Sequence, residues 1–140
     1  MLKIVLDANV FASALLNPHG KPADILDLVF DNRVRLIATL SILEELRRVL
    51  SYPKLVNRHG LSEGEVEEFV YDLLLTAVAV VDEGDPVEAI AKDPSDNKYL
   101  SCGAEARADF IVSGDRHLLE LGSYKGIRIV TPAMFLELME

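Results

Sequence analysis

The chain has 140 residues, half of them hydrophobic, which is enough for one domain with a buried core and predicts a single domain over residues 1–140. It carries 23 acidic and 14 basic residues, and the net charge of −9 has the wrong sign for a protein that binds nucleic acid through its overall charge. The single cysteine, Cys102, excludes an internal disulfide and is expected to be a small buried residue in a reducing compartment.

Targeting signals are not predicted. No apolar run approaches the ~20 residues that a membrane span needs. The apolar stretch near the start is interrupted by Asp7 and Asn9, which a secretory signal does not tolerate well. We therefore expect a cytoplasmic protein without a membrane association.

In chain order, short runs of branched aliphatic residues alternate with segments of helical spacing. The predicted strands are Leu2–Leu6, Val34–Ala38, Val78–Val81, Phe110–Val112 and Ile127–Val130. Ser62 and Glu65 have the spacing of a capping box ahead of a helix, and Asn17 to Gly20 separates two helical segments. This alternation predicts an α/β fold, a three-layer α/β/α sandwich around a central, mainly parallel sheet of about five strands.

Two acidic residues follow predicted strands. Asp7 ends the first strand, and Asp115 follows Phe110–Val112 after a Ser113-Gly114 turn. The carboxyl ends of parallel strands meet at one edge of a sheet, where such folds bind ligands. Each aspartate alone is also well explained as a helix cap or turn residue.

Two further acids lie on predicted helices. Glu45 is about 100° from the centre of the apolar face of its helix, at the rim, whereas Glu44, at about 160°, is expected to face water. Asp93 before Pro94 has the pattern of an N-cap, which places Asp96 in the first helical turn. Glu45 can equally be an ordinary boundary residue, and Asp96 can simply complement the helix dipole.

Four motifs, in order and spacing, resemble those of the PIN domain superfamily, and most closely its VapC-like branch of toxin–antitoxin toxins. They are "IVLDANVFASALL", "ELRRVL" followed by "YPK", "DPSDNKYL" and "IVSGDRHLL". The resemblance implies that an acidic cluster of catalytic, metal-binding residues falls on Asp7, Glu45, Asp96 and Asp115. It also implies accessory polar roles for Asn9 and Ser113. Some relatives carry a further acid near the last aspartate, where this chain has Arg116 and His117.

The resemblance implies a ribonuclease that uses Mg²⁺ or Mn²⁺, is the toxin of a toxin–antitoxin pair, has a cognate antitoxin as partner, and forms a homodimer. Hard divalent cations prefer carboxylate oxygens, and one or two of them can activate water and stabilise the leaving oxygen of a phosphodiester. An RNA substrate would need local basic patches. The candidates are Arg47, Arg48, Lys54, Arg58, Lys98, Arg116 and His117. Each of these is equally an ordinary surface charge.

His19, His59 and His117 have no metal-ligand spacing and are interpreted as surface or loop residues.

Two other function classes stay open. A phosphatase of the haloacid dehalogenase type also has an aspartate at the tip of its first strand, but its second aspartate, two residues later, is Asn9 here. A non-catalytic module of the same fold could bind RNA or protein without cutting. A covalent phosphate on Asp7 would favour the phosphatase, and RNA binding without cleavage or metal dependence would favour the module.

Overall fold

The computed structural model describes residues 1–76, 78–84 and 94–140. In this part of the chain, six strands form one sheet in the order β3-β2-β1-β4-β6-β5. The strands are β1 (Leu2–Leu6), β2 (Val34–Ala38), β3 (Val78–Val80), β4 (Phe110–Val112), β5 (Ser123–Tyr124) and β6 (Ile127–Val130). All neighbouring pairs are parallel except β5 and β6. The predicted α/β fold with a mainly parallel sheet is confirmed, with the two-residue β5 as an additional strand.

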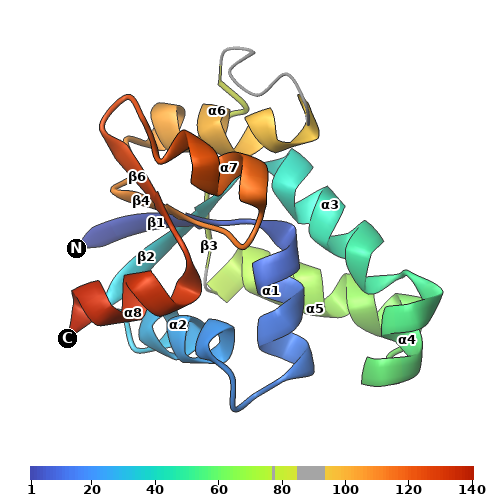
Figure 1. Cartoon of the computed structure of the whole chain (residues 1–140). Coiled ribbons are helices and arrows are strands. Elements are labelled where there is room, and N and C mark those ends of the chain that lie inside the picture. Colours follow the sequence, from blue (N-terminus) through green and yellow to red (C-terminus); the bar gives the residue numbers. More distant parts are fainter. Residues whose placement is uncertain (77, 85–93) are drawn as a thin grey trace.

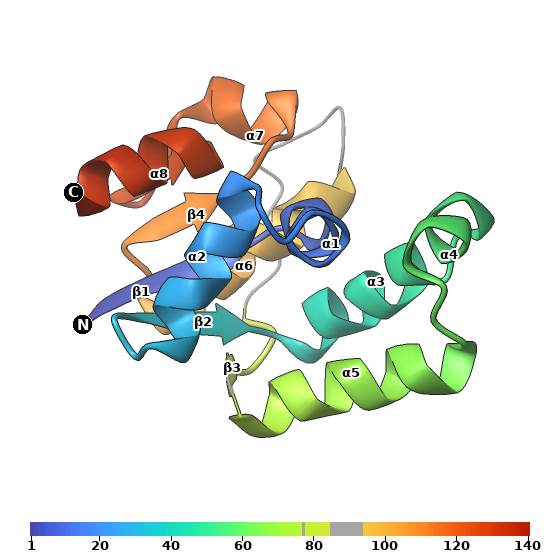
Figure 2. The same cartoon turned by 90° about the horizontal axis from the view of Figure 1, so that it is seen from below.

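Helices cover both faces of this sheet. They are α1 (Ala8–Leu16), α2 (Lys21–Phe30), α3 (Leu40–Leu50), α4 (Pro53–His59), α5 (Glu63–Thr76), α6 (Asn97–Ala106), α7 (Arg116–Leu121) and α8 (Pro132–Met139), with a 3₁₀ turn η1 (Pro94–Asp96) before α6. In Figure 1, α6 and α7 lie on one side of the sheet, and α2 and α8 on the other. Figure 2 shows α3, α4 and α5 extending together away from the sheet.

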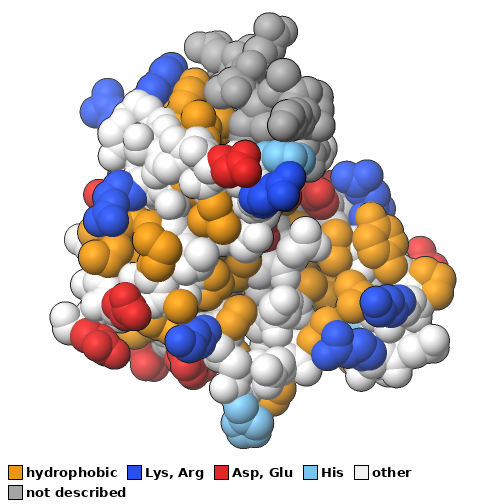
Figure 3. All heavy atoms as spheres, viewed as in Figure 1, with side chains coloured by type: hydrophobic (Ala, Val, Ile, Leu, Met, Phe, Trp, Pro, Cys, Tyr) orange, Lys and Arg blue, Asp and Glu red, His pale blue; other side chains and the backbone are white. Residues whose placement is uncertain are grey.

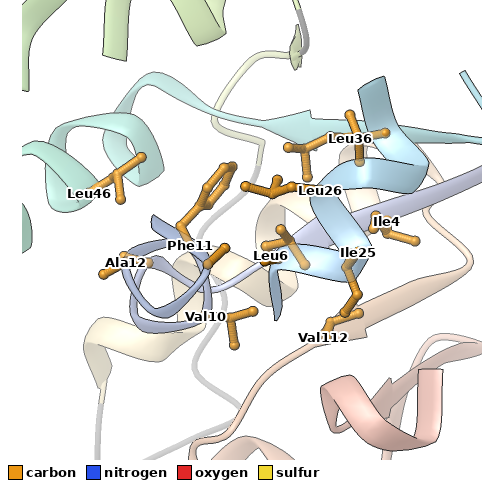
Figure 4. Packing of buried hydrophobic residues seen from close by; sticks show 14 of the residues in the cluster. Ile4, Leu6, Val10, Phe11, Ala12, Ile25, Leu26, Leu36, Leu46 and Val112 are labelled. Atoms are coloured by element: carbon orange, nitrogen blue, oxygen red, sulfur yellow. The ribbon is translucent and has the colours of Figure 1, made fainter. Parts of the chain in front are cut away.

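The central strand β1 is buried on both faces, which explains its unbroken aliphatic sequence. Ile4 and Leu6 point into one core, whereas Val5 points into the other, and all three are fully buried. In Figure 4, Phe11 of α1 and Leu26 of α2 lie beside Leu6 in the first of these cores. β1 is therefore a rigid support for the residue that follows it, Asp7.

Several local predictions can be compared with the structure. The capping box is confirmed, since Ser62 and Glu65 exchange hydrogen bonds between side chain and backbone at 3.1 and 3.2 Å. Cys102 is buried, and burial raises the pKa of its thiol to about 12. The predicted cap Asp93 lies outside the described residues. Within the described ranges, no helix is long and apolar enough to cross a membrane.

Candidate functional site

Asp7 and Asp115 meet at the carboxyl edge of the sheet, because β1 and β4 are adjacent and parallel. Asp7 is only 3% exposed and caps α1, its Oδ1 accepting the Val10 N–H at 2.8 Å. Its other oxygen, Oδ2, accepts the hydroxyl of the fully buried Ser113. The same Ser113 hydroxyl accepts the Asp115 N–H at 2.9 Å. One serine thus connects the two aspartates.

Burial raises the pKa of Asp7, and the negative charge of Asp115 raises it further. Hydrogen bonds from Ser113, Val10 and Gly114 act in the opposite direction without cancelling the effect of burial. Burial therefore makes the carboxylate form of Asp7 less favourable than it is for an aspartate in water. A cation at this position would offset that penalty.

Asp115 is the N-cap of α7. Its Oδ1 accepts the N–H groups of His117 and Leu118 at 2.8 and 3.2 Å, so the first turn of α7 holds the carboxylate in place. Asp96 approaches from the end of η1. Ligand atoms of Asp96, Asp115 and His117 all lie within 4.8 Å of one another, a spacing that could hold a metal ion.

An open pocket of about 380 Å³ borders this edge of the sheet. Its lining residues are Asp7, Asn9, Val10, Ser13, Pro22, Gly114, Asp115 and Pro132. The exposed Asn9 lies in the lining as an accessory residue would, whereas Ser113 supports Asp7 from below and is not part of the lining. A substrate group in this pocket would meet both aspartates.

Glu45 lies at the rim of the apolar face of α3, as its position on the helix predicts, and Glu44 is exposed and paired with Arg47. The Oε2 of Glu45 accepts the Tyr99 hydroxyl at 2.8 Å and forms an ion pair with Lys98 at 2.5 Å. Its carboxylate is therefore held by two residues of α6.

Tyr99 also connects Glu45 to the start of α1. Its hydroxyl oxygen accepts the Ala8 N–H at 3.0 Å, one residue after Asp7. The ring is only 2% exposed, and burial raises the pKa of the phenol, as do the hydrogen bond to Glu45 and the nearby charges of Glu45 and Asp7. Tyr99 is thus a neutral link between α1, α3 and α6.

The structure brings three of the four predicted acids together at one edge of the sheet, and Glu45 lies in neither of the two groups that they form. Asp7 and Asp115 line the pocket, and Asp115 is also grouped with Asp96 and His117. Glu45 reaches this edge only through Tyr99. Sequence reasoning missed Tyr99, whose link to Glu45 spans 54 positions in the chain and leaves no local pattern.

Two of the histidines are only partly exposed and turn a ring nitrogen toward the protein. His117 is in the first turn of α7, and its Nδ1 is buried. His59 is the last residue of α4 and is half-buried, with Nε2 2.7 Å from the Leu50 carbonyl. His19 is exposed, as expected.

The chain is similar to known proteins both in sequence and in fold. The chain is 32% identical to Uncharacterized protein MJ1680 of Methanocaldococcus jannaschii, over 99% of this chain and 92% of the other. Its fold is similar to a chain in the crystal structure of VapBC2 from Rickettsia felis bound to a DNA fragment from their promoter. The TM-score is 0.56 at 14% identity, covering 91% of this chain and 97% of the other.

The family comparison includes all four predicted acids. The family model of the PIN domain matches residues 3–117, a range that runs from β1 into α7 and contains Asp7, Glu45, Asp96, Asp115 and His117. The chain therefore belongs to the PIN domain family.

Proposed function

We propose that this protein is a divalent-metal-dependent ribonuclease whose catalytic acids are Asp7, Glu45, Asp96 and Asp115. PIN domains are typically nucleases, which supports phosphodiester hydrolysis. The main observation behind the proposal is the environment of Asp7. Its carboxyl group is buried, its pKa is raised, and it lies beside Asp115 at an open pocket. Its hydrogen bonds do not cancel the cost of burying the charge, and a cation bound beside it would offset that cost.

The residues at this edge fit Mg²⁺ or Mn²⁺. Carboxylate oxygens are the ligands that these hard cations prefer, and Asp96 and Asp115 offer them within 4.8 Å of each other. When bound, such an ion makes water more acidic and offsets the charge of a phosphodiester. The chain's own part is to hold the acids: Ser113 fixes Asp7, and α7 fixes Asp115.

The accessory residues have separate roles in this proposal. Ser113 orients Asp7 and Asp115 through its single hydroxyl. Asn9 presents an amide to the pocket, where it can position the substrate or a water. Tyr99 and Lys98 hold Glu45 and keep it from pointing elsewhere.

RNA binding by so acidic a chain needs local positive charge. Arg47 and Arg48 lie in the last turn of α3, and α4 carries Lys54 and Arg58. In Figure 3, basic side chains are interspersed with hydrophobic ones over this side of the molecule. We propose that the RNA backbone crosses this region on its way to the pocket, with Lys98 adding a charge near Glu45.

The similarity in fold to VapBC2 supports a role as the toxin of a toxin–antitoxin pair, acting in the cytoplasm with a cognate antitoxin as partner. A homodimer would extend the RNA-binding surface. Leu40 on α3 and Tyr71 and Leu75 on α5 are each more than half exposed and suit such an interface. A short antitoxin-like reading frame directly upstream of the gene would support the toxin role.

The test is cleavage of a mixed RNA pool with Mg²⁺ or Mn²⁺, with and without EDTA. We expect cleavage that EDTA abolishes and that falls more than about a hundredfold in Asp7→Asn and in Asp115→Asn. Asparagine keeps the capping oxygen of both residues, so these variants are expected to fold. Asp27→Asn, at an exposed position of α2, is the matched control and should cleave normally.

Three outcomes would contradict the proposal. Cleavage unchanged in Asp7→Asn would remove Asp7 from the site. Phosphate released from phosphomonoesters, with a covalent phosphate on Asp7, would make the protein a phosphatase. RNA bound without cleavage and without metal dependence would make it a binding module.

A further inference from the structure

His117 brings a nitrogen atom to the acidic group at the end of β4. It lies in the first turn of α7, two residues after Asp115. Its Nδ1 is 3.9 Å from Oδ1 of Asp115, and ligand atoms of Asp96, Asp115 and His117 lie within 4.8 Å of one another. Two segments of the chain, η1 and the start of α7, thus present two carboxylates and one imidazole to the same small volume.

The Nδ1 atom is buried and has no hydrogen-bond partner among the residues that the structure describes. The 3.9 Å to Asp115 is too long for a hydrogen bond. The rest of the ring reaches the surface, since 27% of the side chain is exposed. The imidazole therefore turns one nitrogen inward, toward the carboxylates, instead of placing both in water. A buried nitrogen in this position needs a partner.

The other two histidines show that this arrangement is not general in the chain. The Nε2 of His59 is 2.7 Å from the Leu50 carbonyl, and its Nδ1 accepts the Leu61 N–H at 2.8 Å. Both of its nitrogens have structural partners. His19 is exposed in the loop before α2. Of the three, His117 has a nitrogen directed at acidic groups.

We propose that Nδ1 of His117 is a ligand of the ion that Asp96 and Asp115 bind, and that it makes the site selective for Mn²⁺ over Mg²⁺. This inference rests on the metal-dependent function proposed above. Divalent ions hold nitrogen and oxygen ligands at about 2.0–2.2 Å, so two ligands of one ion lie about 3–4 Å apart. The 3.9 Å between His117 and Asp115 meets this condition.

The selectivity follows from the type of ligand. Carboxylate oxygen and water suit Mg²⁺ and Mn²⁺ alike, whereas imidazole nitrogen favours first-row transition metals. Mg²⁺ gains little from a nitrogen ligand and is reluctant to give up its waters. A site with two carboxylates and one imidazole therefore binds Mn²⁺ more tightly than Mg²⁺, whereas a site of carboxylates alone does not distinguish the two ions.

The position of His117 is fixed by the same turn that fixes Asp115. The Oδ1 of Asp115 accepts the backbone N–H of His117, so one helical turn fixes the carboxylate relative to the backbone from which the imidazole projects. Two ligands from one turn require less ordering on binding than two from separate segments.

The experiment measures Mn²⁺ binding to the metal-free full chain by electron paramagnetic resonance, with pulsed measurements that detect ¹⁴N next to the ion. We expect ¹⁴N coupling in the wild type, its loss in His117→Gln and its retention in the matched control His19→Gln. Mn²⁺ affinity should weaken about tenfold in His117→Gln. Mg²⁺ affinity, measured by competition with Mn²⁺, should change less than about twofold.

A second measurement does not depend on a variant that folds. Wild-type protein labelled with ¹⁵N only at histidine should replace the ¹⁴N signal with a ¹⁵N signal. Mn²⁺ bound without any nitrogen coupling would overturn the role of His117 and leave the carboxylate site standing. Coupling that persists in His117→Gln would also overturn it. Failure to bind either ion would overturn the proposed function as well.

Discussion

Asp7 serves two purposes that the sequence presents as alternatives. One oxygen caps α1 through Val10, as a purely structural aspartate would. The other is held by Ser113 on the side of Asp115. A neutral cap would do the first task at lower cost, because burial raises the pKa of this carboxyl. A buried carboxyl with a raised pKa, used where a neutral cap would be more stable, is typical of a functional acid.

Asp7→Asn should therefore raise the melting temperature of the metal-free protein at neutral pH. Burial makes ionisation of this carboxyl more costly in the folded state than in the unfolded state, and asparagine removes that cost while keeping the capping oxygen. Because the pKa is raised in the folded state, the gain should shrink as the pH falls through that pKa. The gain in melting temperature should vanish below pH 3.8, the ordinary pKa of aspartate, where Asp7 is protonated in both the folded and the unfolded state. Thermal unfolding of both proteins in EDTA across this pH range measures the gain. A melting temperature lower in Asp7→Asn than in the wild type at neutral pH would contradict the argument.

Tyr99→Phe should destabilise the fold by about 1–3 kcal/mol, since it leaves the buried Ala8 N–H without its acceptor. It also removes the donor to Glu45, so activity should fall together with stability. Urea unfolding measures the first effect and RNA cleavage the second. Tyr71→Phe, with the tyrosine 59% exposed on α5, is the control and should be neutral. Equal stability of the two variants would show that the Tyr99 hydroxyl does not support α1.

For single residues, the sequence predicts where a side chain lies on its helix or strand better than it predicts which distant residue that side chain contacts. The helical position of Glu45 correctly places it at a rim, and the strand ends correctly place Asp7 and Asp115 at one edge. Tyr99 and the inward nitrogen of His117 could not be predicted in this way. Both depend on how α6 and α7 pack against distant segments.

Among the elements, α6 shows how packing against the sheet positions the site. Gly103 is buried, and its missing side chain lets α6 approach the sheet closely. A Cβ there would lie 3.1 Å from Ile127 and 3.3 Å from Ile111. This contact fixes the depth of α6 and therefore the reach of Tyr99 and Lys98 toward Glu45. The sequence does not predict β5, because its two residues are too few to show the alternating hydrophobic pattern of a strand.

Gly103→Ala should destabilise the protein by about 1 kcal/mol. Overpacking costs about 1–3 kcal/mol, and the better helix propensity of alanine returns only about 0.5–1. Gly64→Ala in α5 makes the same change where nothing lies within 4 Å, and it should stabilise by about 0.5 kcal/mol. Chemical denaturation of both variants measures whether their changes in the free energy of unfolding have opposite signs. Stabilisation by both would mean that α6 is not tightly packed at Gly103.

For the whole molecule, the charge of −9 and the acidic edge combine to make stability depend on cations. Two contributions must be separated. Any salt screens the general repulsion of an acidic surface, whereas a specific ion binds only at the site. Mg²⁺ at a hundred times its dissociation constant would stabilise the folded state by about 2.7 kcal/mol through binding alone.

We therefore expect Mg²⁺ to raise the melting temperature by about 5–10 °C above that in NaCl of equal ionic strength. Asp115→Asn should respond to both salts alike, because it changes the charge of the chain by only one unit but removes the carboxylate that lies with Asp96 and His117 and beside Asp7. Asp27→Asn loses the same single charge at an exposed position and should keep the full Mg²⁺ effect. If Asp115→Asn retained the difference between Mg²⁺ and NaCl, the ion would bind elsewhere and the acidic edge would lose its proposed role.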